Sequence, residues 1–218
     1  GRLTQICDSN QRLWSPLPHL AIVPSSTLAP MATELETLRL TAESCTDCRL
    51  AETRTNVVFG VGAPDADVMI VGEAPGKNED HQGEPFVGAA GRLHETLISE
   101  VGIERDQVYI ANVLKCRPPG NRDPRPDEIE ACKGYLRRQL ELIEPAVVVT
   151  LGNFSTKLLL RTETGITKMR GQRYQWWRDI VVVPTFHPAA ALRGRADVEE
   201  AMRQDFKLVR VTIDEKGT

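Results

Sequence analysis

A strand-to-loop transition occupies Val68–Gly91, which reads VMIVGEAPGKNEDHQGEPFVGAAG. Val68 to Val71 are too few for a helix and are followed at once by turn-forming residues, so they predict a buried strand. Five glycines in the loop permit close backbone approach or positive φ, and Pro75 and Pro85 restrict the path between them. We therefore expect a loop of defined shape at the carboxyl end of a strand, where open α/β sheets bind ligands.

The loop carries one carboxylate and one aromatic ring at informative positions. Glu73 follows the strand directly, and Phe86 is the only aromatic residue of the stretch. A helix predicted from about Gly88 begins just after that ring, and its free amides could face an anion. Short glycine patterns are weak signals, so the stretch alone also fits the strand-to-helix connection of any nucleotide-binding α/β protein.

Outward from this loop, apolar strands alternate with amphipathic helices. Alternation of this kind predicts parallel pairing with right-handed crossovers. The expected fold is one three-layer α/β/α sandwich, residues 31–218, with a short and mainly parallel central sheet. The further strands are expected at Gln107–Ala111 and Ala146–Leu151, with a hairpin-like pair at Gln172–Trp177 and Ile180–Thr185, and helices from about Thr33, at Pro126, after Gly152 and from Ala196.

Residues 1–30 differ in character from the rest of the chain. They hold four prolines and scattered serines without periodicity, which predicts a disordered N-terminal extension without a signal-peptide layout. A helical pattern begins at Met31, so we expect the natural start there, and Cys7 is interpreted as a bystander.

Composition narrows the class of protein. The chain has 218 residues, 41% hydrophobic content and a net charge of −3. We expect a soluble protein with no membrane partner, since no apolar run is long enough to span a bilayer. The charge argues against coating nucleic acid by bulk attraction and allows a local basic patch. Nothing in the pattern demands more than a monomer.

Four of the five cysteines form a spaced set. Cys45 and Cys48 make a C-x2-C pair, 67 residues separate Cys48 from Cys116, and 15 separate Cys116 from Cys132. An extracellular disulfide framework is a poor fit. Four thiolates can bind zinc or an iron-sulfur cluster, and the residues alone leave the metal open. Cys132 also lies on the apolar face of its predicted helix, so a plain core cysteine is the alternative there.

Two more polar residues follow predicted strands. Asn112 ends the second strand and His187 follows the last one. In a parallel sheet both belong to the same edge as Glu73. A turn-forming asparagine and a structural histidine are the simpler interpretations of each residue taken alone.

Basic residues gather in two segments. Lys115, Arg117 and Arg122 lie in the loop after the second strand, where phosphate contact is the natural use and a solvated loop the alternative. Leu192 stands beside Arg193 in the other segment, and such an apolar tip can wedge into a base stack while arginines meet phosphates.

The strings G-E-A-P-G, E-D and G-x-P-F-V-G-x-A-G together resemble the iron-sulfur type 4 uracil-DNA glycosylases, over roughly Cys45 to Arg193. The resemblance implies a DNA repair hydrolase of base excision repair that flips uracil out of single- or double-stranded DNA, hydrolyses its N-glycosidic bond and leaves an abasic site. It implies catalytic roles for Glu73 and His187, and a 4Fe-4S cluster in preference to zinc on Cys45, Cys48, Cys116 and Cys132. The residues expected around the base are Gly72, Ala74, Gly76, Phe86 and Asn112.

Three other interpretations stay open. Some superfamily relatives bind uracil DNA covalently through an extra histidine, but no histidine occurs here between His94 and His187, and Ala74 stands where those relatives place glutamine. A non-catalytic iron-sulfur DNA-binding module would bind DNA without releasing uracil. A nucleotide-binding enzyme would use the helix start near Gly88.

Overall fold

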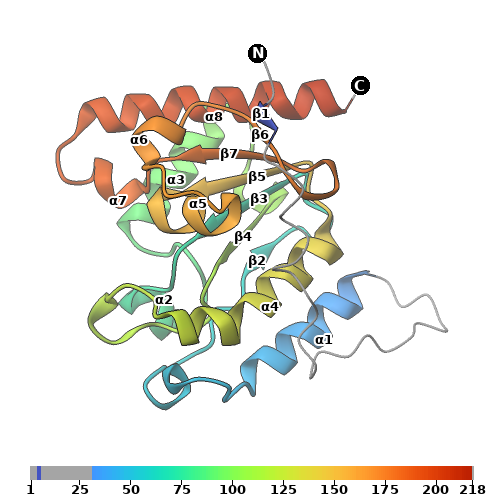
Figure 1. The fold of residues 1–218 in the computed structure, drawn as a ribbon, viewed down its shortest axis with the longest axis vertical. Coiled ribbons are helices and arrows are strands. Elements are labelled where there is room, and N and C mark those ends of the chain that lie inside the picture. The colour runs from blue at the N-terminus through green and yellow to red at the C-terminus, as the bar shows by residue number, and fades with distance from the viewer. Residues whose placement is uncertain (1–3, 6–30, 218) are drawn as a thin grey trace.

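A computed structural model describes residues 4–5 and 31–217, and its strands form one mixed sheet (Figure 1). The strand order is β1-β6-β7-β5-β3-β4-β2. The four central strands run parallel, while β2 and β6 pair antiparallel with β4 and β7. The expected mainly parallel sheet is therefore confirmed. The strands are β1 (Thr4–Gln5), β2 (Val61–Gly62), β3 (Val68–Gly72), β4 (Val108–Asn112), β5 (Val147–Leu151), β6 (Tyr174–Gln175) and β7 (Val181–Thr185).

Helices cover both faces of the sheet, with α3 and α8 on one side and α4 and α5 on the other, where α1 packs on α4 (Figure 1). The helices are α1 (Met31–Glu43), α2 (Lys77–Gln82), α3 (Ala89–Ser99), α4 (Pro126–Ile143), α5 (Gly152–Leu160), α6 (Ile166–Met169), α7 (Pro188–Ala191) and α8 (Ala196–Lys216). Short 3-10 turns are η2 (Arg49–Glu52), η3 (Arg105–Gln107), η4 (Pro119–Asn121) and η5 (Trp177–Asp179).

Two hydrophobic clusters, one on each face, hold the layers together. In β3, Val68 and Ile70 pack in the cluster shared with α3 and α8, whereas Met69 and Val71 pack in the cluster shared with α4 and α5. Every residue of β3 is buried because both faces are covered, which explains the unbroken apolar run in the sequence. The three-layer α/β/α expectation is confirmed.

Local sequence explains where the elements begin. Pro126 opens α4 as expected, and the Glu128 carboxylate accepts a hydrogen bond from the Arg125 backbone N–H at 2.9 Å, which satisfies a free amide at the helix start. Helix α2 was not expected, since its six polar residues show no apolar periodicity. It lies between Gly76 at its N-cap and Gly83, whose φ of 77° ends it.

The chain order reverses direction at one point of the sheet. From β3 the chain passes to β4 on one side and later to β5 on the other, so β3 lies at a topological switch point. Ligands of open α/β sheets bind outside the carboxyl ends of strands at such a point. Loops that follow β3, β4, β5 and β7 therefore meet there.

The expected N-terminal extension, apart from Thr4 and Gln5 in β1, lies outside the described residues, and so does Cys7. Among the described helices, none combines the length and the apolar composition that crossing a membrane requires.

Candidate active site

Glu73 and Asn112 are placed by the ends of two paired strands. Gly72 and Asn112 are register partners, and the ladder continues beyond them, with Val113 N–H donating to Gly72 O and Leu114 N–H donating to Glu73 O, both at 3.0 Å. A Cβ at Gly72 would lie 2.3 Å from Asn112 Oδ1 and 2.9 Å from Phe86 Cζ. Glycine at this position therefore lets the amide and the aromatic ring approach each other.

Phe86 is held in an unusual backbone conformation. Its φ is 56°, which a bulky residue adopts only when its surroundings impose it. A Cβ at Gly91 would lie 1.6 Å from Phe86 O, so the helix start can pass beneath the residue only as glycine. Arg105 Nη2 donates to Pro85 O at 2.8 Å from the other side. These contacts fix the ring beside Asn112.

His187 follows the end of β7 and lies at the same edge of the sheet. Its ring centroid is 6.1 Å from that of Phe86, and a Cβ at Gly152 would lie 3.2 Å from His187 Cβ. Ala189 N–H donates to His187 Nδ1 at 3.2 Å, which leaves the proton of a neutral ring on Nε2. Burial lowers the pKa of His187. The charge of Glu79 raises this pKa and the charge of Arg193 lowers it, and the net shift is downward. The site therefore offers a neutral imidazole N–H donor.

Burial raises the pKa of Glu73, and the negative charge of Asp123 adds to this effect. Two other acidic residues of the loop, Glu79 and Asp80, brace its backbone. Glu79 Oε1 accepts a hydrogen bond from Gly88 N–H at 3.4 Å, and buried Asp80 accepts one from Thr55 N–H at 2.9 Å. Gly76 lies against Glu79, because a Cβ there would be 2.7 Å from its Oε2. The half-buried Ala74 packs beside the sheet.

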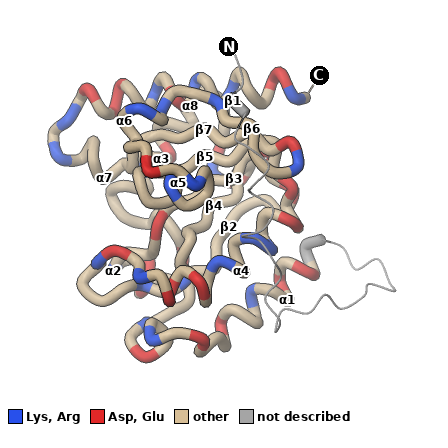
Figure 2. The backbone as a smooth tube through the Cα atoms, viewed as in Figure 1, with Lys and Arg blue, Asp and Glu red and all other residues tan. Residues whose placement is uncertain are grey.

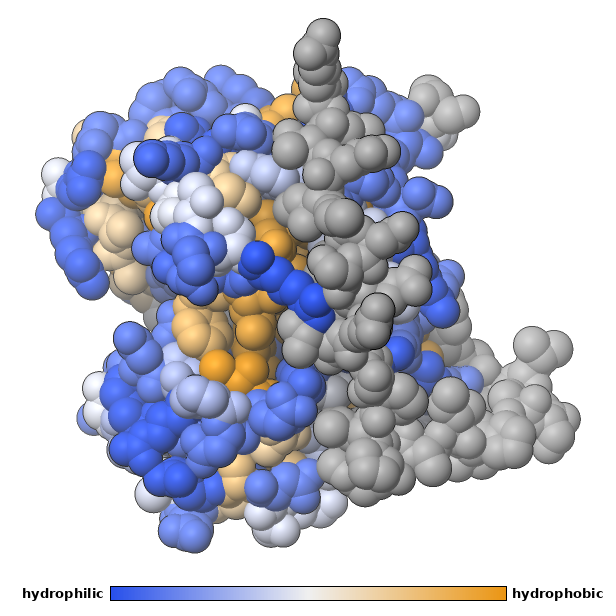
Figure 3. Space-filling model, viewed as in Figure 1, coloured by the Kyte–Doolittle hydropathy of each residue, from blue (hydrophilic) through white to orange (hydrophobic). Residues whose placement is uncertain are grey.

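The structure thus brings Glu73, Phe86, Asn112 and His187 to one edge of the sheet. The space-filling view shows hydrophobic residues at the bottom of a hollow between α5 and the α2–α4 region (Figure 3). A carboxylate, an amide and a neutral imidazole around an aromatic ring can bind a flat heterocycle and stabilise opposite charges on its two sides.

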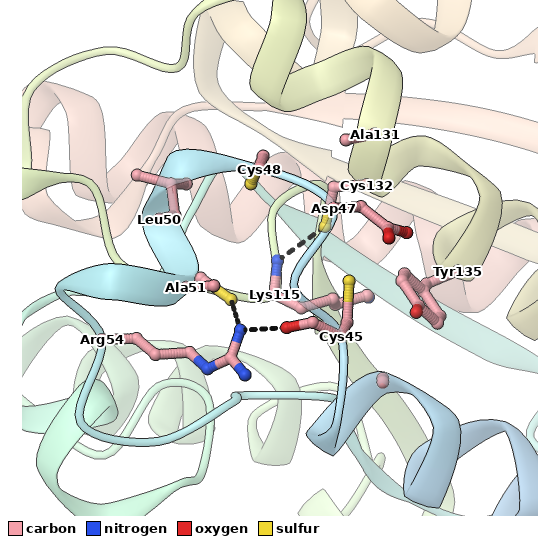
Figure 4. A pocket seen from close by; sticks show the side chains of 12 residues that line it. Cys45, Asp47, Cys48, Leu50, Ala51, Arg54, Lys115, Ala131, Cys132 and Tyr135 are labelled. Carbon is pink, nitrogen blue, oxygen red and sulfur yellow. Dashed lines mark hydrogen bonds between the residues drawn. The ribbon is translucent and has the colours of Figure 1, made fainter.

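A second site lies beside α1 and α4, where the four spaced cysteines line one cavity (Figure 4). Cys45 and Cys48 follow the end of α1, Cys116 follows β4, and Cys132 lies on α4; all four are free thiols. The predicted convergence of the two distant segments is therefore present in the structure.

Hydrogen-bond donors point at the sulfur atoms of this cavity. Arg54 Nη1 donates to Cys116 Sγ at 3.5 Å and to Cys45 O at 2.7 Å, and Lys115 N–H donates to Cys132 Sγ at 3.2 Å (Figure 4). Burial raises the pKa of the Cys116 thiol, and that of the Cys132 thiol to about 12. N–H donors at sulfur are the outer contacts that metal-bound thiolates use.

The cysteine cavity supplies the donor set of a four-thiolate metal site. Its lining includes four cysteine side chains, which zinc and iron-sulfur clusters both take as ligands. As the side chains lie in this structure, no three of His, Cys, Asp or Glu within the described residues are gathered closely enough to hold one metal ion.

Lys115 corrects the expected DNA-binding set. The prediction that it contacts phosphate is wrong, because its side chain is 2% exposed and its ammonium donates to Asn112 O at 2.8 Å and to Gln139 Oε1 at 2.6 Å. Burial lowers the pKa of Lys115 to about 7. The apolar neighbours Val113 and Leu114 were the sequence signal of this burial.

The other predicted DNA-binding residues lie at or near the surface. Arg117 Nε donates to Asn121 Oδ1 at 2.7 Å, and Arg122 is committed to Glu128, with Nη2 to Oε1 at 2.5 Å. Leu192 is 51% exposed and adjoins exposed Arg193, in the turn between α7 and α8 that carries basic residues (Figure 2). Contact of these residues with DNA stays a prediction.

Three residues that matter to the geometry escaped the sequence reasoning. Arg54 and Arg105 act through side-chain contacts with segments far along the chain, which no local pattern reveals. His94 is fully buried behind Phe86 at a ring distance of 5.8 Å, and within the described residues its two ring nitrogens have no hydrogen-bond partner. The position of His94 on the apolar face of a predicted helix is the sequence feature that indicates its burial.

Fold and site together define a class of α/β protein with polar side chains at the carboxyl edge of a parallel sheet and a separate cavity lined by four cysteines. The profile of the uracil DNA glycosylase superfamily matches residues 59–209, and the chain belongs to this superfamily.

Several curated relatives are called type-4 uracil-DNA glycosylases, which confirms the resemblance drawn from the loop motifs. The protein of Sulfurisphaera tokodaii is 50% identical over 81% of this chain and 83% of its own length. That of Archaeoglobus fulgidus is 46% identical over 76% and 86%. That of Saccharolobus solfataricus is 45% identical over 79% and 83%.

Proposed function

We propose that this protein is a monofunctional uracil-DNA glycosylase, a hydrolase that removes uracil from DNA and leaves an abasic site for base excision repair. The observation that supports the proposal is that Asn112 and His187 both lie near the Phe86 ring, with Glu73 next to Gly72, the register partner of Asn112. The names of the relatives support the same reaction.

Recognition of the base rests on Phe86 and Asn112. A base rotated out of the helix stacks on the buried ring, and the amide offers a donor and an acceptor to the O4 and N3–H edge of uracil. Cytosine presents an amino group and a bare N3 at that edge, so an amide held in one orientation rejects it. The close approach at Gly72 fixes this orientation, since Asn112 Oδ1 and Phe86 Cζ both face the glycine.

Cleavage of the N-glycosidic bond requires groups of both signs. Positive charge grows on the sugar and negative charge on the departing uracil. The Glu73 carboxylate places the attacking water and stabilises the sugar cation, while His187 donates its Nε2 proton to uracil O2 in a hydrogen bond. One preorganised donor of this kind is worth about 3 kcal/mol of barrier. The hydrogen bond from Ala189 N–H to Nδ1 keeps the proton on the required nitrogen.

Extraction of the base is assigned to the turn between α7 and α8. The exposed Leu192 enters the stack left by the base, and Arg193 contacts the flanking phosphates. Arg117 and Arg122, in the loop after β4, contact further phosphates. Uracil-containing DNA, single- or double-stranded, is the partner that this surface fits.

The cysteine cavity is proposed to hold a 4Fe-4S cluster. Cys45, Cys48, Cys116 and Cys132 would be its ligands, and Arg54 and the Lys115 amide would donate to its sulfurs. When bound, it supplies a cross-link between the end of α1, the loop after β4 and helix α4. We propose a monomer that works in the cytoplasm beside chromosomal DNA.

A direct experiment incubates the purified protein with an oligonucleotide containing one uracil, followed by alkali and gel electrophoresis. Cleavage at the uracil after alkali, and none before it, is expected of a monofunctional glycosylase. Thymine and cytosine oligonucleotides are the matched controls. Binding of the uracil strand without any release would instead establish the non-catalytic DNA-binding module.

Specificity is tested with Asn112→Asp. A carboxylate cannot donate to uracil O4, so uracil release is expected to fall by about a hundredfold or more, with cytosine release rising relative to it. Competition between uracil and cytosine oligonucleotides measures the ratio. Unchanged discrimination would move base recognition to another side chain.

A further inference from the structure

Lys115 lies between the two sites and touches both. Its ammonium donates to the main-chain carbonyl of Asn112 at 2.8 Å, and its own backbone N–H donates to Cys132 Sγ at 3.2 Å. The next residue along the chain is Cys116, and Lys115 itself lines the cysteine cavity (Figure 4). A single buried residue therefore connects the base-recognising strand end to two cysteines.

Lys115 extends from the cysteine cavity to the strand end. Its backbone N–H donates to Cys132 Sγ, and Cys116 follows it in the chain. Its ammonium contacts Asn112 O and Gln139 Oε1 at the other end of the side chain. A metal group on these two cysteines would therefore fix the backbone from which the ammonium reaches Asn112.

We propose that Lys115 is a positioning residue that couples the metal site to base recognition, its backbone being held by Cys132 and Cys116, two of the proposed metal ligands, while its ammonium holds the carbonyl of Asn112. The inference rests on the proposed function for the meaning of Asn112. Its physical core, that metal occupancy sets the order of residues 112–116, is independent of any reaction.

The surroundings of Lys115 restrict the movement of its backbone and of its side chain. Its carbonyl accepts a hydrogen bond from Val58 N–H at 2.8 Å. Gln139, its other partner, is held by Nε2 donating to Phe59 O at 2.9 Å and to Tyr109 Oη at 3.0 Å. A displacement of the cysteines is therefore passed to Asn112 and is not absorbed by side-chain motion. His187, on β7, does not belong to this network and keeps its place.

The variant Lys115→Met removes the charge and the donor with little change of shape. Iron per protein or the reduction potential of the cluster is expected to fall, because a nearby positive charge stabilises the reduced, more negative form. Uracil release is expected to drop by about 10- to 100-fold, with a loss of uracil-over-cytosine discrimination. Wild-type iron content, potential and discrimination together in Lys115→Met would overturn the coupling.

Lys133→Met is the matched control. Lys133 also adjoins Cys132 in the chain, but its ammonium pairs with Glu130 at 2.7 Å at the surface. The same charge is removed without touching Asn112, so potential and discrimination are expected to stay near wild type. An equal effect of both variants would show that Lys115 acts only by adding positive charge near the cysteines, and would overturn the proposal.

A second measurement uses the unaltered protein and does not depend on a variant that folds. Iron is removed by mild oxidation with a chelator, and hydrogen exchange is followed at the amides of Val113 and Leu114, which donate to Gly72 and Glu73. Faster exchange there, with β5 and β7 still protected and protection restored on reloading iron and sulfide, is expected. Unchanged exchange at these amides after iron loss would overturn the coupling.

Uracil release by the wild-type protein is measured in the same series. If that protein releases no uracil, the proposed function fails, while potential and exchange still decide whether Lys115 couples the two regions. If it releases uracil and neither potential nor exchange responds, the coupling alone fails.

Discussion

At the carboxyl edge of the sheet, Glu73 and Asn112 stand on neighbouring strands whose hydrogen bonds fix their backbones, whereas the four cysteines come from a turn, a loop and a helix. The strand-end site owes its geometry to the main chain and to glycines that admit close contacts. The cysteine cavity owes its geometry to side chains, and the proposed metal group would restrain them further.

Substitutions in the two regions should therefore have different effects. Changes at the sheet edge should alter turnover and leave metal content and stability intact. Changes at the cavity should remove metal and stability first and affect turnover through Asn112.

Glu73→Gln should lower the rate of uracil release by about a thousandfold, because the neutral amide neither orients water as a carboxylate does nor stabilises a sugar cation. Single-turnover kinetics on a uracil oligonucleotide measure the rate. DNA affinity and iron content should equal those of the wild type, and turnover near wild type would remove Glu73 from the mechanism.

Cys45→Ser should break the cavity without touching the sheet edge. Metal ligands contribute binding free energy to folding, and losing even about 3 kcal/mol of it lowers the Tm of a chain this size by roughly 6–12 °C. Iron analysis and thermal melting check this. Cys7→Ser, outside the spaced set, is the control, and a Cys45→Ser protein with full iron would remove Cys45 from the ligands.

Gly72→Ala should disturb the sheet edge alone. The new Cβ would lie 2.3 Å from Asn112 Oδ1, so the amide must move, and a displacement of this size costs about a hundredfold in kcat/KM. Gly88→Ala is the matched control, since its Cβ would lie 3.6 Å from its nearest neighbour at an ordinary φ of −87°. Equal activity of the two variants would show that Asn112 needs no fixed position.

Leu192→Ala should affect duplex DNA more than single strands. Without the wedge, the unpaired stack closes on the extruded base, so release from duplex should fall by about tenfold. Leu40→Ala on α1 removes an equally exposed leucine, 54% against 51%, away from the sheet edge (Figure 1). A loss that is the same on both kinds of DNA would argue against a wedge.

Asp123→Asn should shift the pH dependence of kcat/KM. In the proposed mechanism Glu73 acts as a carboxylate, and its pKa is raised by burial and further by Asp123, so activity should be lost as pH falls through that raised value. Removing the Asp123 charge should therefore move the acidic limb to lower pH. Asp127→Asn, which loses the exposed ion pair with Arg49, should leave the limb in place. An unmoved limb in Asp123→Asn would assign it to another group.

Much of the fold follows from residue order. Apolar runs mark β3, β4 and β5, and the ends of these strands place Glu73 and Asn112 together without any knowledge of contacts. The spacing of the cysteines predicts their convergence on one cavity. These features are local or follow from parallel pairing, which is why sequence predicts them.

Other features depend on distant side chains. A lysine in a basic loop looks like a phosphate ligand, and only tertiary packing shows that Lys115 is enclosed by Gln139 and Asn112. The support of Phe86 by Arg105 and His94 likewise joins segments that no periodicity relates. Helix α2 has no apolar face to predict it, since its limits are set by two glycines.

The peptide between Asn112 and Cys116 has a further consequence for anyone who edits this chain. The length of this segment is fixed by its contacts. Adding or deleting one residue there would turn Lys115 away from its acceptors and displace either the Asn112 amide or the Cys116 thiol. A design that transfers these sites to another protein must therefore keep residues 112–116 at their present length. The loop after α5, by contrast, has exposed residues at Glu163 and Thr164, so an insertion there should disturb the fold less.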